Sequence, residues 1–170
     1  MNNFSRRSFS IALLPAATAL GIVPPSLAAP KKCAAGMTEE RFRAYIDAFN
    51  RDDYSSFGDY YDEDVVLVIA GKTELRGRQA IFDFYKTVKS QTKRTIQVNK
   101  VITAPDRLAA ELQSEFLALE DLPDFTAGPM KKGGRIFINT FVIYDLRGGK
   151  FARIRSAEFR KIDRQAGGAG

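Results

Sequence analysis

The apolar residues of this chain repeat with one period in its first half and with another in its second half. From about residue 38 to residue 90 they recur every three to four positions, and Phe42, Tyr45, Ile46 and Phe49 fall at i, i+3, i+4 and i+7. From about residue 95 they alternate, which is the spacing of side chains on one face of a strand. Helices followed by a run of strands predict an α+β fold, in which the helices cover one face of a curved, largely antiparallel sheet.

The same periods, together with turn residues, predict where each element begins and ends. Helices are expected from Thr38 to about Arg51, from Ser55 or Ser56 to about Tyr61, and from about Arg78 to Ser90. Strands are expected at 65–70 and at about 95–103, 108–121, 135–146 and 150–161, with turns at 71–77 and 147–149. Residues 122–134 are expected to form a long loop, at a position suited to a lid over a pocket.

The strand that begins at Arg135 is apolar on both of its faces. One row contains Phe137, Phe141 and Ile143, and the other contains Ile136 and Val142. The helices can cover one row only, so the other row needs a second cover, and another copy of the sheet would supply it. We therefore expect a homodimer or a homotrimer.

The two ends of the chain are expected to lie outside the fold. Residues 1–28 combine an arginine pair, a short apolar run and small residues, which predicts an export signal that is removed. The Arg6-Arg7 pair followed by Ser8 and Phe9 is typical of a twin-arginine signal of a bacterial periplasmic protein; an ordinary secretion signal is the alternative. Residues 29–37 are expected to be flexible, 38–161 to form one domain, and 162–170 to be a disordered tail.

The charge balance argues against nucleic acid as a partner. The chain has 26 basic and 20 acidic residues, and removal of Arg6 and Arg7 with the signal leaves 24 minus 20, or +4. This charge is mild and evenly spread, so Lys93-Arg94 and Lys131-Lys132 are interpreted as solvated loop charges. No stable membrane insertion is expected once the signal is removed.

The chain contains no histidine. Ser-His and Cys-His nucleophile pairs, Asp-His dyads and histidine-ligated zinc are therefore excluded, because each of them needs an imidazole. We predict no metal site and no cofactor, so any chemistry must use carboxylates, phenols, amides and fixed cations.

Three stretches of the sequence resemble signatures of the nuclear transport factor 2-like superfamily, which includes the SnoaL-like polyketide cyclases and ketosteroid isomerase. They are YIDAFN at 45–50, YDEDV at 61–65 and LRGRQAIFDFY at 75–85, and the resemblance covers residues 38–161. It implies a SnoaL-like, cystatin-like α+β roll, with a cone-shaped mixed or antiparallel sheet wrapped around three N-terminal helices. It also implies an apolar pocket between the helices and the concave face of the sheet.

Carried over position by position, the resemblance places two oxygen-binding groups in that pocket. The tyrosine of ketosteroid isomerase matches Tyr45, and its oxyanion-holding aspartate matches Asn139. The position of the catalytic base falls on Ile69 or Val68, which cannot abstract a proton, so a plain copy of the steroid reaction is not expected. A structural reading of Tyr45, as a core residue with its hydroxyl at the edge, stands beside the catalytic one.

Strand glutamates are the remaining candidates for a proton carrier. The resemblance turns Glu111, Gln113 and Glu115 towards the pocket, and on the last strand it turns Ile154, Ser156 and Glu158 inward. A carboxylate in an apolar cleft has a raised pKa and can act near neutral pH. The alternative is that these acids face solvent and pair with arginines, since a slip of one residue reverses every assignment. The other residues expected at the pocket are Phe57, Tyr61, Phe82, Tyr85, Arg135, Phe137 and Phe141.

Two functions are compatible with these residues. The first is an exported, cofactor-free lyase, dehydratase or isomerase that acts on a hydrophobic, oxygenated ring compound of aromatic, polyketide-like or steroid-like type. In it Tyr45 and Asn139 hold an oxygen, and Glu111, Glu115 or Glu158 moves a proton. The alternative is a periplasmic module that binds a hydrophobic small molecule without turnover. A third, weaker option is a protein-interaction role of the sheet's outer face.

Overall fold

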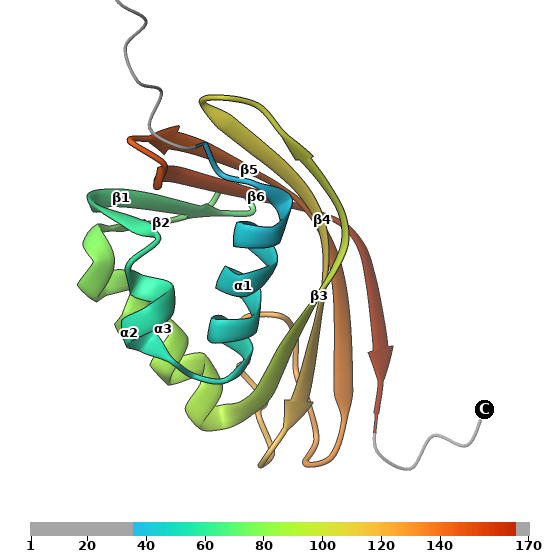
Figure 1. Ribbon diagram of the computed structural model, residues 1–170. Coiled ribbons are helices and arrows are strands. Elements are labelled where there is room, and N and C mark those ends of the chain that lie inside the picture. Colours follow the sequence, from blue (N-terminus) through green and yellow to red (C-terminus); the bar gives the residue numbers. More distant parts are fainter. Residues whose placement is uncertain (1–35, 166–170) are drawn as a thin grey trace, which may run out of the picture. The chain divides into compact units, whose positions relative to one another are not determined.

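A computed structural model describes residues 36–165, in which helices come first and a strand meander follows (Figure 1). The helices are α1 (Glu39–Asn50), α2 (Tyr54–Gly58) and α3 (Gly77–Gln91). The strands are β1 (Tyr61–Ile69), β2 (Thr73–Arg76), β3 (Thr92–Thr103), β4 (Arg107–Ala118), β5 (Arg135–Arg147) and β6 (Lys150–Arg164). The predicted α+β class is confirmed, and the predicted elements occur in the expected order, with β2 as one additional strand. The export signal predicted for residues 1–28 lies outside the described residues.

Several predicted boundaries need correction. Strand β2 was missed, because its four residues are mostly exposed and polar and therefore carry no apolar alternation. Tyr61, expected to end the second helix, opens β1 instead. Strand β6 continues to Arg164, into the predicted tail, and Met37 is buried although it was assigned to a flexible segment. The 147–149 turn is confirmed, with Gly148 and Gly149 at φ 59° and 77°, which a tight hairpin turn requires.

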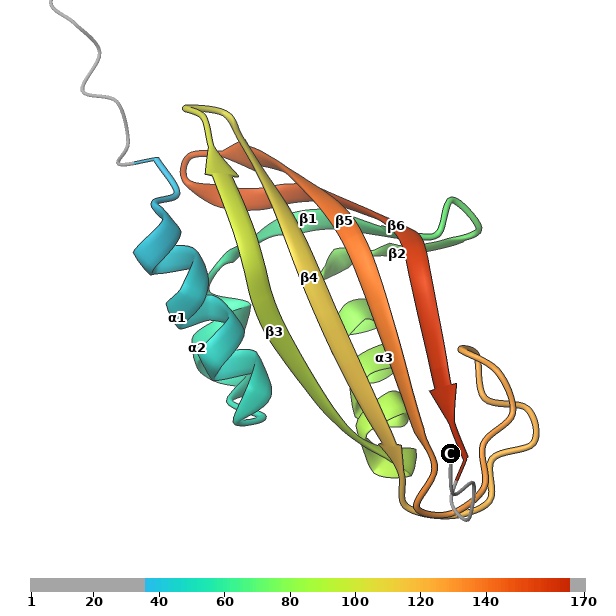
Figure 2. The same ribbon diagram turned by 90° about the vertical axis from the view of Figure 1, so that its right-hand side faces the viewer.

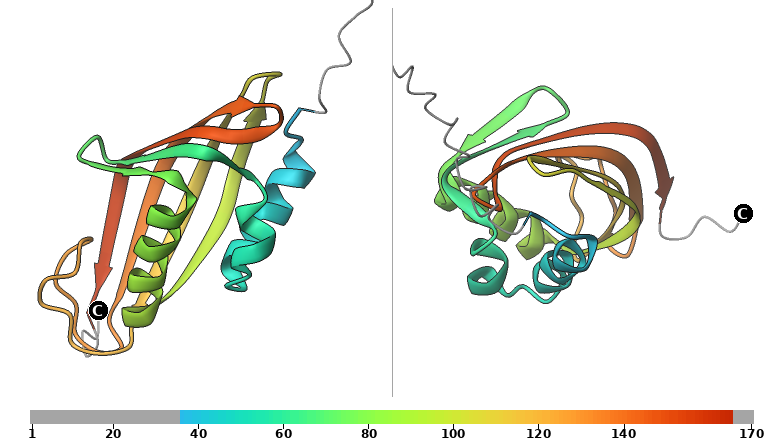
Figure 3. Two further views of the ribbon diagram at one scale, coloured as in Figure 1. Left: turned by 90° about the vertical axis from the view of Figure 1, so that its left-hand side faces the viewer. Right: turned by 45° about the horizontal axis from the view of Figure 1, so that its top comes forward.

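The six strands form one mixed, curved sheet in the order β2-β1-β6-β5-β4-β3 (Figure 2). Strands β1 and β6 run parallel, and every other neighbouring pair is antiparallel. Figure 3 shows the helices inside the curve of the sheet, where α1 lies against β3 and α3 lies against β1. The sheet therefore has a concave inner face towards the helices and an outer face away from them.

Side chains at the helix ends fasten the helices to the sheet. At its start, α1 is capped by Thr38, whose hydroxyl accepts the N–H of Arg41. At its end, the Asn50 amide donates to the Ile96 carbonyl and accepts the Ile96 N–H, both at 2.8 Å. Helix α3 is held at its start by Arg78, which donates at 2.6 Å to the Tyr61 carbonyl on β1. These contacts set the distance between the helices and the inner face.

Two apolar clusters fill the space between helices and sheet. The larger cluster contains the aromatic side chains of α1, α2 and β1, and Phe42, Phe57 and Tyr61 in it are fully buried. The smaller one packs the 122–134 loop against the far end of β4 and β5 through Leu122, Phe125 and Met130. Leu122 and Met130 also exchange backbone hydrogen bonds of 2.8 and 2.9 Å.

Candidate functional site

A cavity of about 400 Å³ lies between the helices and the inner face of the sheet. Its walls come from α1, α3, β1, β3, β4, β5 and β6, and Thr126 and Ala127 of the long loop also line it. Most of the lining side chains are apolar. The polar ones are Tyr45, Lys72, Thr73, Tyr85, Arg94, Ser114, Thr126, Thr140, Tyr144, Ser156 and Glu158.

On strand β4 the cavity is lined by Leu112, Ser114 and Phe116. Because side chains alternate along a strand, Glu111, Gln113 and Glu115 point from the outer face. The expectation that these three residues face the pocket is therefore wrong by one position in the register.

The same correction applies to strand β5, whose cavity row is Ile138, Thr140, Val142 and Tyr144. Arg135, Phe137, Asn139 and Phe141 belong to the outer row, so none of them lies in the pocket as predicted. Asn139 is buried to 7% exposure, but it is buried on the outer side of the sheet. Hydrophobicity could not decide the question, because both rows of this strand are apolar.

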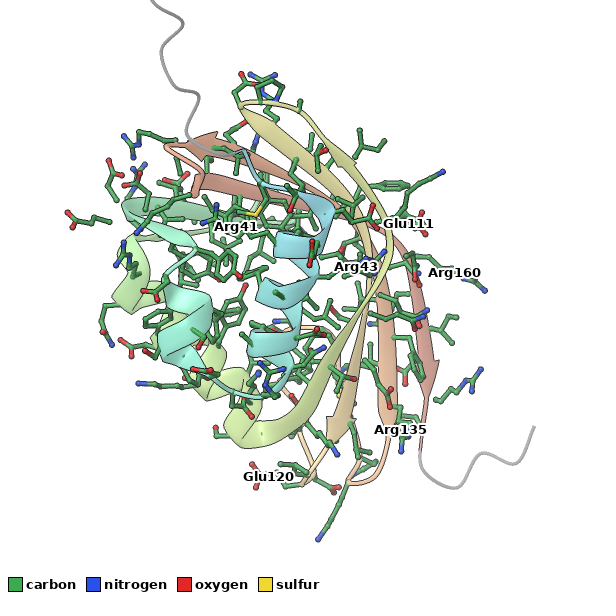
Figure 4. The ribbon with its side chains drawn as sticks, in the orientation of Figure 1. Arg41, Arg43, Glu111, Glu120, Arg135 and Arg160 are labelled. Carbon is green, nitrogen blue, oxygen red and sulfur yellow. The ribbon has the colours of Figure 1, made fainter. Side chains whose placement is uncertain are left out.

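The acids on β4 take part in outer-face contacts. Glu115 forms an ion pair with Arg135, and Glu111 accepts a hydrogen bond of 3.2 Å from the Asn99 amide. Figure 4 shows Glu111, Arg135 and Arg160 projecting from the sheet away from the helices. For the two β4 acids, the structure thus agrees with the alternative interpretation, in which they face solvent.

On β6 the structure places Ile154, Ser156 and Glu158 on the cavity wall. Glu158 is exposed, so its carboxylate sits at a solvent-accessible part of that wall. Of Ile69 and Val68, the two positions on which the resemblance places the base, Ile69 lines the cavity. Within residues 36–165, Glu158 is the one carboxylate that lines it.

The predicted aromatic residues divide into two groups. Tyr45 and Tyr85 line the cavity, whereas Phe57, Tyr61 and Phe82 belong to the aromatic core behind it. The two groups touch, because the hydroxyls of Tyr45 and Tyr61 lie 2.9 Å apart and share a hydrogen bond. The position of the Tyr45 phenol is therefore set by a second phenol that is itself fully buried.

The phenols at the cavity are neutral groups. Burial raises the pKa of Tyr45 far above its ordinary value, and it raises the pKa of Tyr144 in the same way. Burial also raises the pKa of Tyr85, although the positive charge of Arg94 opposes that rise. These phenols can donate a hydrogen bond to a developing oxyanion, but they cannot act as bases near neutral pH.

Arg94 is a cavity residue that the sequence analysis missed. It lies on β3 opposite Phe116, and its guanidinium lies 4.9 Å from the centre of the Phe116 ring. The predicted strand began at about residue 95, three positions after the true start of β3 at Thr92, so Arg94 was taken for a solvated loop charge. Its spacing of two from Ile96 was the signal that could have placed it on the inner row.

Comparison with known proteins identifies the family. The sequence profile of the SnoaL-like domain matches residues 42–154. The chain belongs to the SnoaL-like domain family. This domain is part of the nuclear transport factor 2-like superfamily, as the resemblance implied. No curated protein matches the sequence significantly.

Solved structures share the fold of this SnoaL-like domain. The epoxide hydrolase/cyclase-like enzyme SalBIII, of pyran ring formation in the polyether salinomycin, is 19% identical, with a TM-score of 0.58 over 71% of this chain and 88% of its own. A SnoaL-like polyketide cyclase from Agrobacterium tumefaciens is 21% identical, with a TM-score of 0.56 over 70% of this chain and 88% of its own. A designed 17-OHP binder is 14% identical, with a TM-score of 0.56 over 72% and 92%. At these identities the likeness shows the fold alone.

Residues 36–165 contain neither a candidate metal site nor a candidate membrane-spanning helix. No group of three or more cysteine, aspartate or glutamate side chains there is arranged to hold a metal ion. None of the helices in this part of the SnoaL-like chain is long and apolar enough to cross a membrane.

Proposed function

We propose that this SnoaL-like protein is a cofactor-free enzyme that moves a proton on a hydrophobic, oxygenated ring compound. The observation that carries the proposal is the shared cavity, because the neutral Tyr45 phenol, the Arg94 cation and the Glu158 carboxylate all line one apolar space. A base and an oxyanion-stabilising group within one largely apolar pocket are the parts that such proton transfers need. The related fold of a SnoaL-like polyketide cyclase and of an epoxide hydrolase/cyclase-like enzyme supports this class of reaction.

The proposed roles follow from charge and position. Glu158 accepts the proton, because it is the carboxylate that reaches the wall. Tyr45 stabilises the oxygen on which negative charge develops by donating a hydrogen bond, and the fixed charge of Arg94 attracts an electronegative group of the ligand. The apolar side chains of β4 and β5 exclude water around the ring. Lyases, dehydratases and isomerases of oxygenated rings all share this proton transfer, and the proposed function is this common step.

The experiment measures that step directly. The enzyme is mixed with 2-indanone, 2-tetralone or a steroid 3-ketone in D₂O, and exchange of the hydrogens next to the carbonyl is followed by NMR. We expect the enzyme to accelerate exchange for at least one ketone, and Glu158→Gln to lower that rate on the order of a hundredfold. The matched control is Glu111→Gln, which removes a carboxylate from the outer face. No acceleration with any ketone, or equal losses in both variants, would contradict the proposal.

Ligand binding without turnover is the second candidate function. It is favoured by the exposure of Glu158, because solvent competes with a ligand for its carboxylate, and by the neutral state of the Tyr45 phenol in the cavity wall. A shaped apolar space with a few donors is enough for binding, and a designed 17-OHP binder shares the fold. Tight binding of a ketone with no proton exchange would select this function over the enzymatic one.

We also propose that the protein is exported to the periplasm. The support is the pattern of residues 1–28, in which an arginine pair precedes an apolar run and small residues. Fractionation of bacterial cells that express the full chain tests the proposal. We expect Arg6→Lys combined with Arg7→Lys to retain the protein in the cytoplasm, whereas an unchanged distribution would point to an ordinary secretion signal.

A second copy is proposed to cover the outer face. Phe141 and Phe159 stack there with ring centres 4.3 Å apart, and they are 53% and 47% exposed. Acids on β4 and arginines on β6 flank these rings, with Glu111 on one side and Arg160 on the other. A two-fold axis along β5 would place the β4 acids of one copy over the β6 arginines of the other, which favours a homodimer.

A further inference from the structure

Arg94 has no acidic partner among the residues that the structure describes. By contrast, Lys89 on α3 forms an ion pair with Asp52, and Arg135 on the outer face pairs with Glu115. The Nη2 of Arg94 donates to the Ser114 hydroxyl at 3.3 Å, a long hydrogen bond. Its Nε is buried and has no acceptor. The Arg94 guanidinium thus has no acidic side chain as a counter-ion within the part of the chain that the structure describes.

Three aromatic rings hold the Arg94 guanidinium in place. Its centre lies 5.3 Å from the ring centres of Phe49 and Tyr85 and 4.9 Å from that of Phe116. Such contacts offset part of the cost of removing the cation from water, but they supply no counter-ion. The guanidinium is therefore positioned in advance for a group that the protein itself does not provide.

We infer that the ligand of this cavity is a ring compound that carries a carboxylate, and that Arg94 pairs with that carboxylate. The inference rests on the proposed function, because it specifies the substrate class of the same site. A planar guanidinium fork matches the two coplanar oxygens of a carboxylate, and the nearby Ser114 hydroxyl supplies a further donor.

The apolar walls determine the rest of the ligand. Leu112 on β4 and Ile138 and Val142 on β5 line the cavity, and they offer a ring contact but no hydrogen bond. The remaining cation of the wall, Lys72, lies in the turn between β1 and β2 and is exposed. One partly buried cation in an apolar space fits a single negative charge at one end of a hydrophobic body.

The experiment compares an acid with its neutral isostere. Binding of 2-naphthoate and 2-naphthamide, and of the smaller pair benzoate and benzamide, is measured by titration calorimetry on the full chain. We expect the wild type to bind at least one acid on the order of tenfold more tightly than its amide. Arg94→Met is expected to abolish this preference and Arg94→Lys to keep part of it. Lys72→Met is the matched control, because it removes an exposed cation from the same cavity and should retain the preference.

Two outcomes overturn the inference. One is a wild type that binds no acid of either pair more tightly than its amide, and the other is an acid preference that survives in Arg94→Met. Folding of the variants is followed by thermal unfolding, in which Arg94→Met should keep or raise the Tm, because it removes an unpaired charge from a partly buried site. If Arg94→Met does not fold, the acid preference is measured in Arg94→Gln and compared with that of the wild type. An acid preference without ketone exchange would refute the enzymatic proposal and leave this inference standing.

Discussion

The inner and outer faces of the sheet are built from the same strands, yet they hold their side chains in different ways. On β5 the inner row places Ile136 and Val142 under the helices, while the outer row leaves Phe141 and Ile143 exposed by 53% and 41%. Charge follows the same division, because Arg135 on the outer face is paired and Arg94 on the inner face is not. The elements packed against a row of side chains, more than the composition of the row, therefore decide whether it forms a core, a pocket or an interface.

Truncation of matched isoleucines on the two faces should give the largest difference. Ile136 is fully buried and Ile143 is 41% exposed, so the change removes the same atoms from two environments. We expect Ile136→Ala to lower the free energy of unfolding by about 3 kcal/mol, and Ile143→Ala to lower it by less than about 1 kcal/mol. Urea unfolding of both variants measures the difference, and equal losses would show that the two faces contribute equally to stability.

A charge introduced into the exposed pair of Phe141 and Phe159 should weaken self-association. This effect is expected to be the second largest. Phe141→Glu inserts a carboxylate where the proposed second copy packs, and we expect it to raise the dimer Kd by at least about tenfold. Sedimentation velocity over a range of concentrations measures this change. Leu119→Glu serves as the control, since Leu119 is 48% exposed but lies beyond the end of β4. A wild type that sediments as a monomer would remove the proposed interface.

Alkaline pH should act on the inner face through its phenols. Burial raises the pKa of Tyr45, Tyr61 and Tyr144 in the folded protein, so the stability they contribute is complete below the unfolded pKa of about 10 and is lost as pH rises above it. Each phenol should lower the free energy of unfolding by about 1.4 kcal/mol per pH unit in that range.

Replacement of one tyrosine by phenylalanine measures how much its phenol contributes to this pH dependence. Tyr144→Phe should reduce the slope of the unfolding free energy against pH by about 1.4 kcal/mol per pH unit. In the wild type, the absorbance of phenolate should appear together with unfolding. Ionisation of these groups well before unfolding would contradict the neutral state assigned to them.

The outer ion pair should give the smallest effect. Glu115→Gln removes the partner of Arg135, whose side chain is 47% exposed. We expect a loss of less than about 1 kcal/mol in the free energy of unfolding, which becomes smaller still at high salt. Urea unfolding at low and high sodium chloride concentration measures it, and a larger, salt-insensitive loss would show that the outer face holds its charges as tightly as the inner face does.

Much of the fold could be predicted because its signals are local. The stripe of Phe42, Tyr45, Ile46 and Phe49 and the cap at Thr38 were enough to place α1, since each depends on residues within a turn or two. Strand β2 was missed for the same reason, because an exposed four-residue edge strand carries no apolar period.

The candidate site could be predicted only in part. On β6, where Ile154 alternates with the charged Arg153 and Arg155, the inward row was readable, and Glu158 follows it. On β5 both rows are apolar, so Asn139 was placed inside although Thr140 is the residue that lines the cavity. Arg94 was not predicted to line the cavity, because the predicted start of its strand was a few residues too late.

The sequence by itself determined the element order, the family and the absence of imidazole chemistry, since these depend on residue types and on short-range spacing. Tertiary structure alone decided which row of β4 and β5 faces the helices, and with it that Glu111 and Glu115 lie outside while Glu158 lines the cavity. The physical reason is that a strand presents two opposite faces with a period of two. Only the helices packed against the sheet distinguish one face from the other.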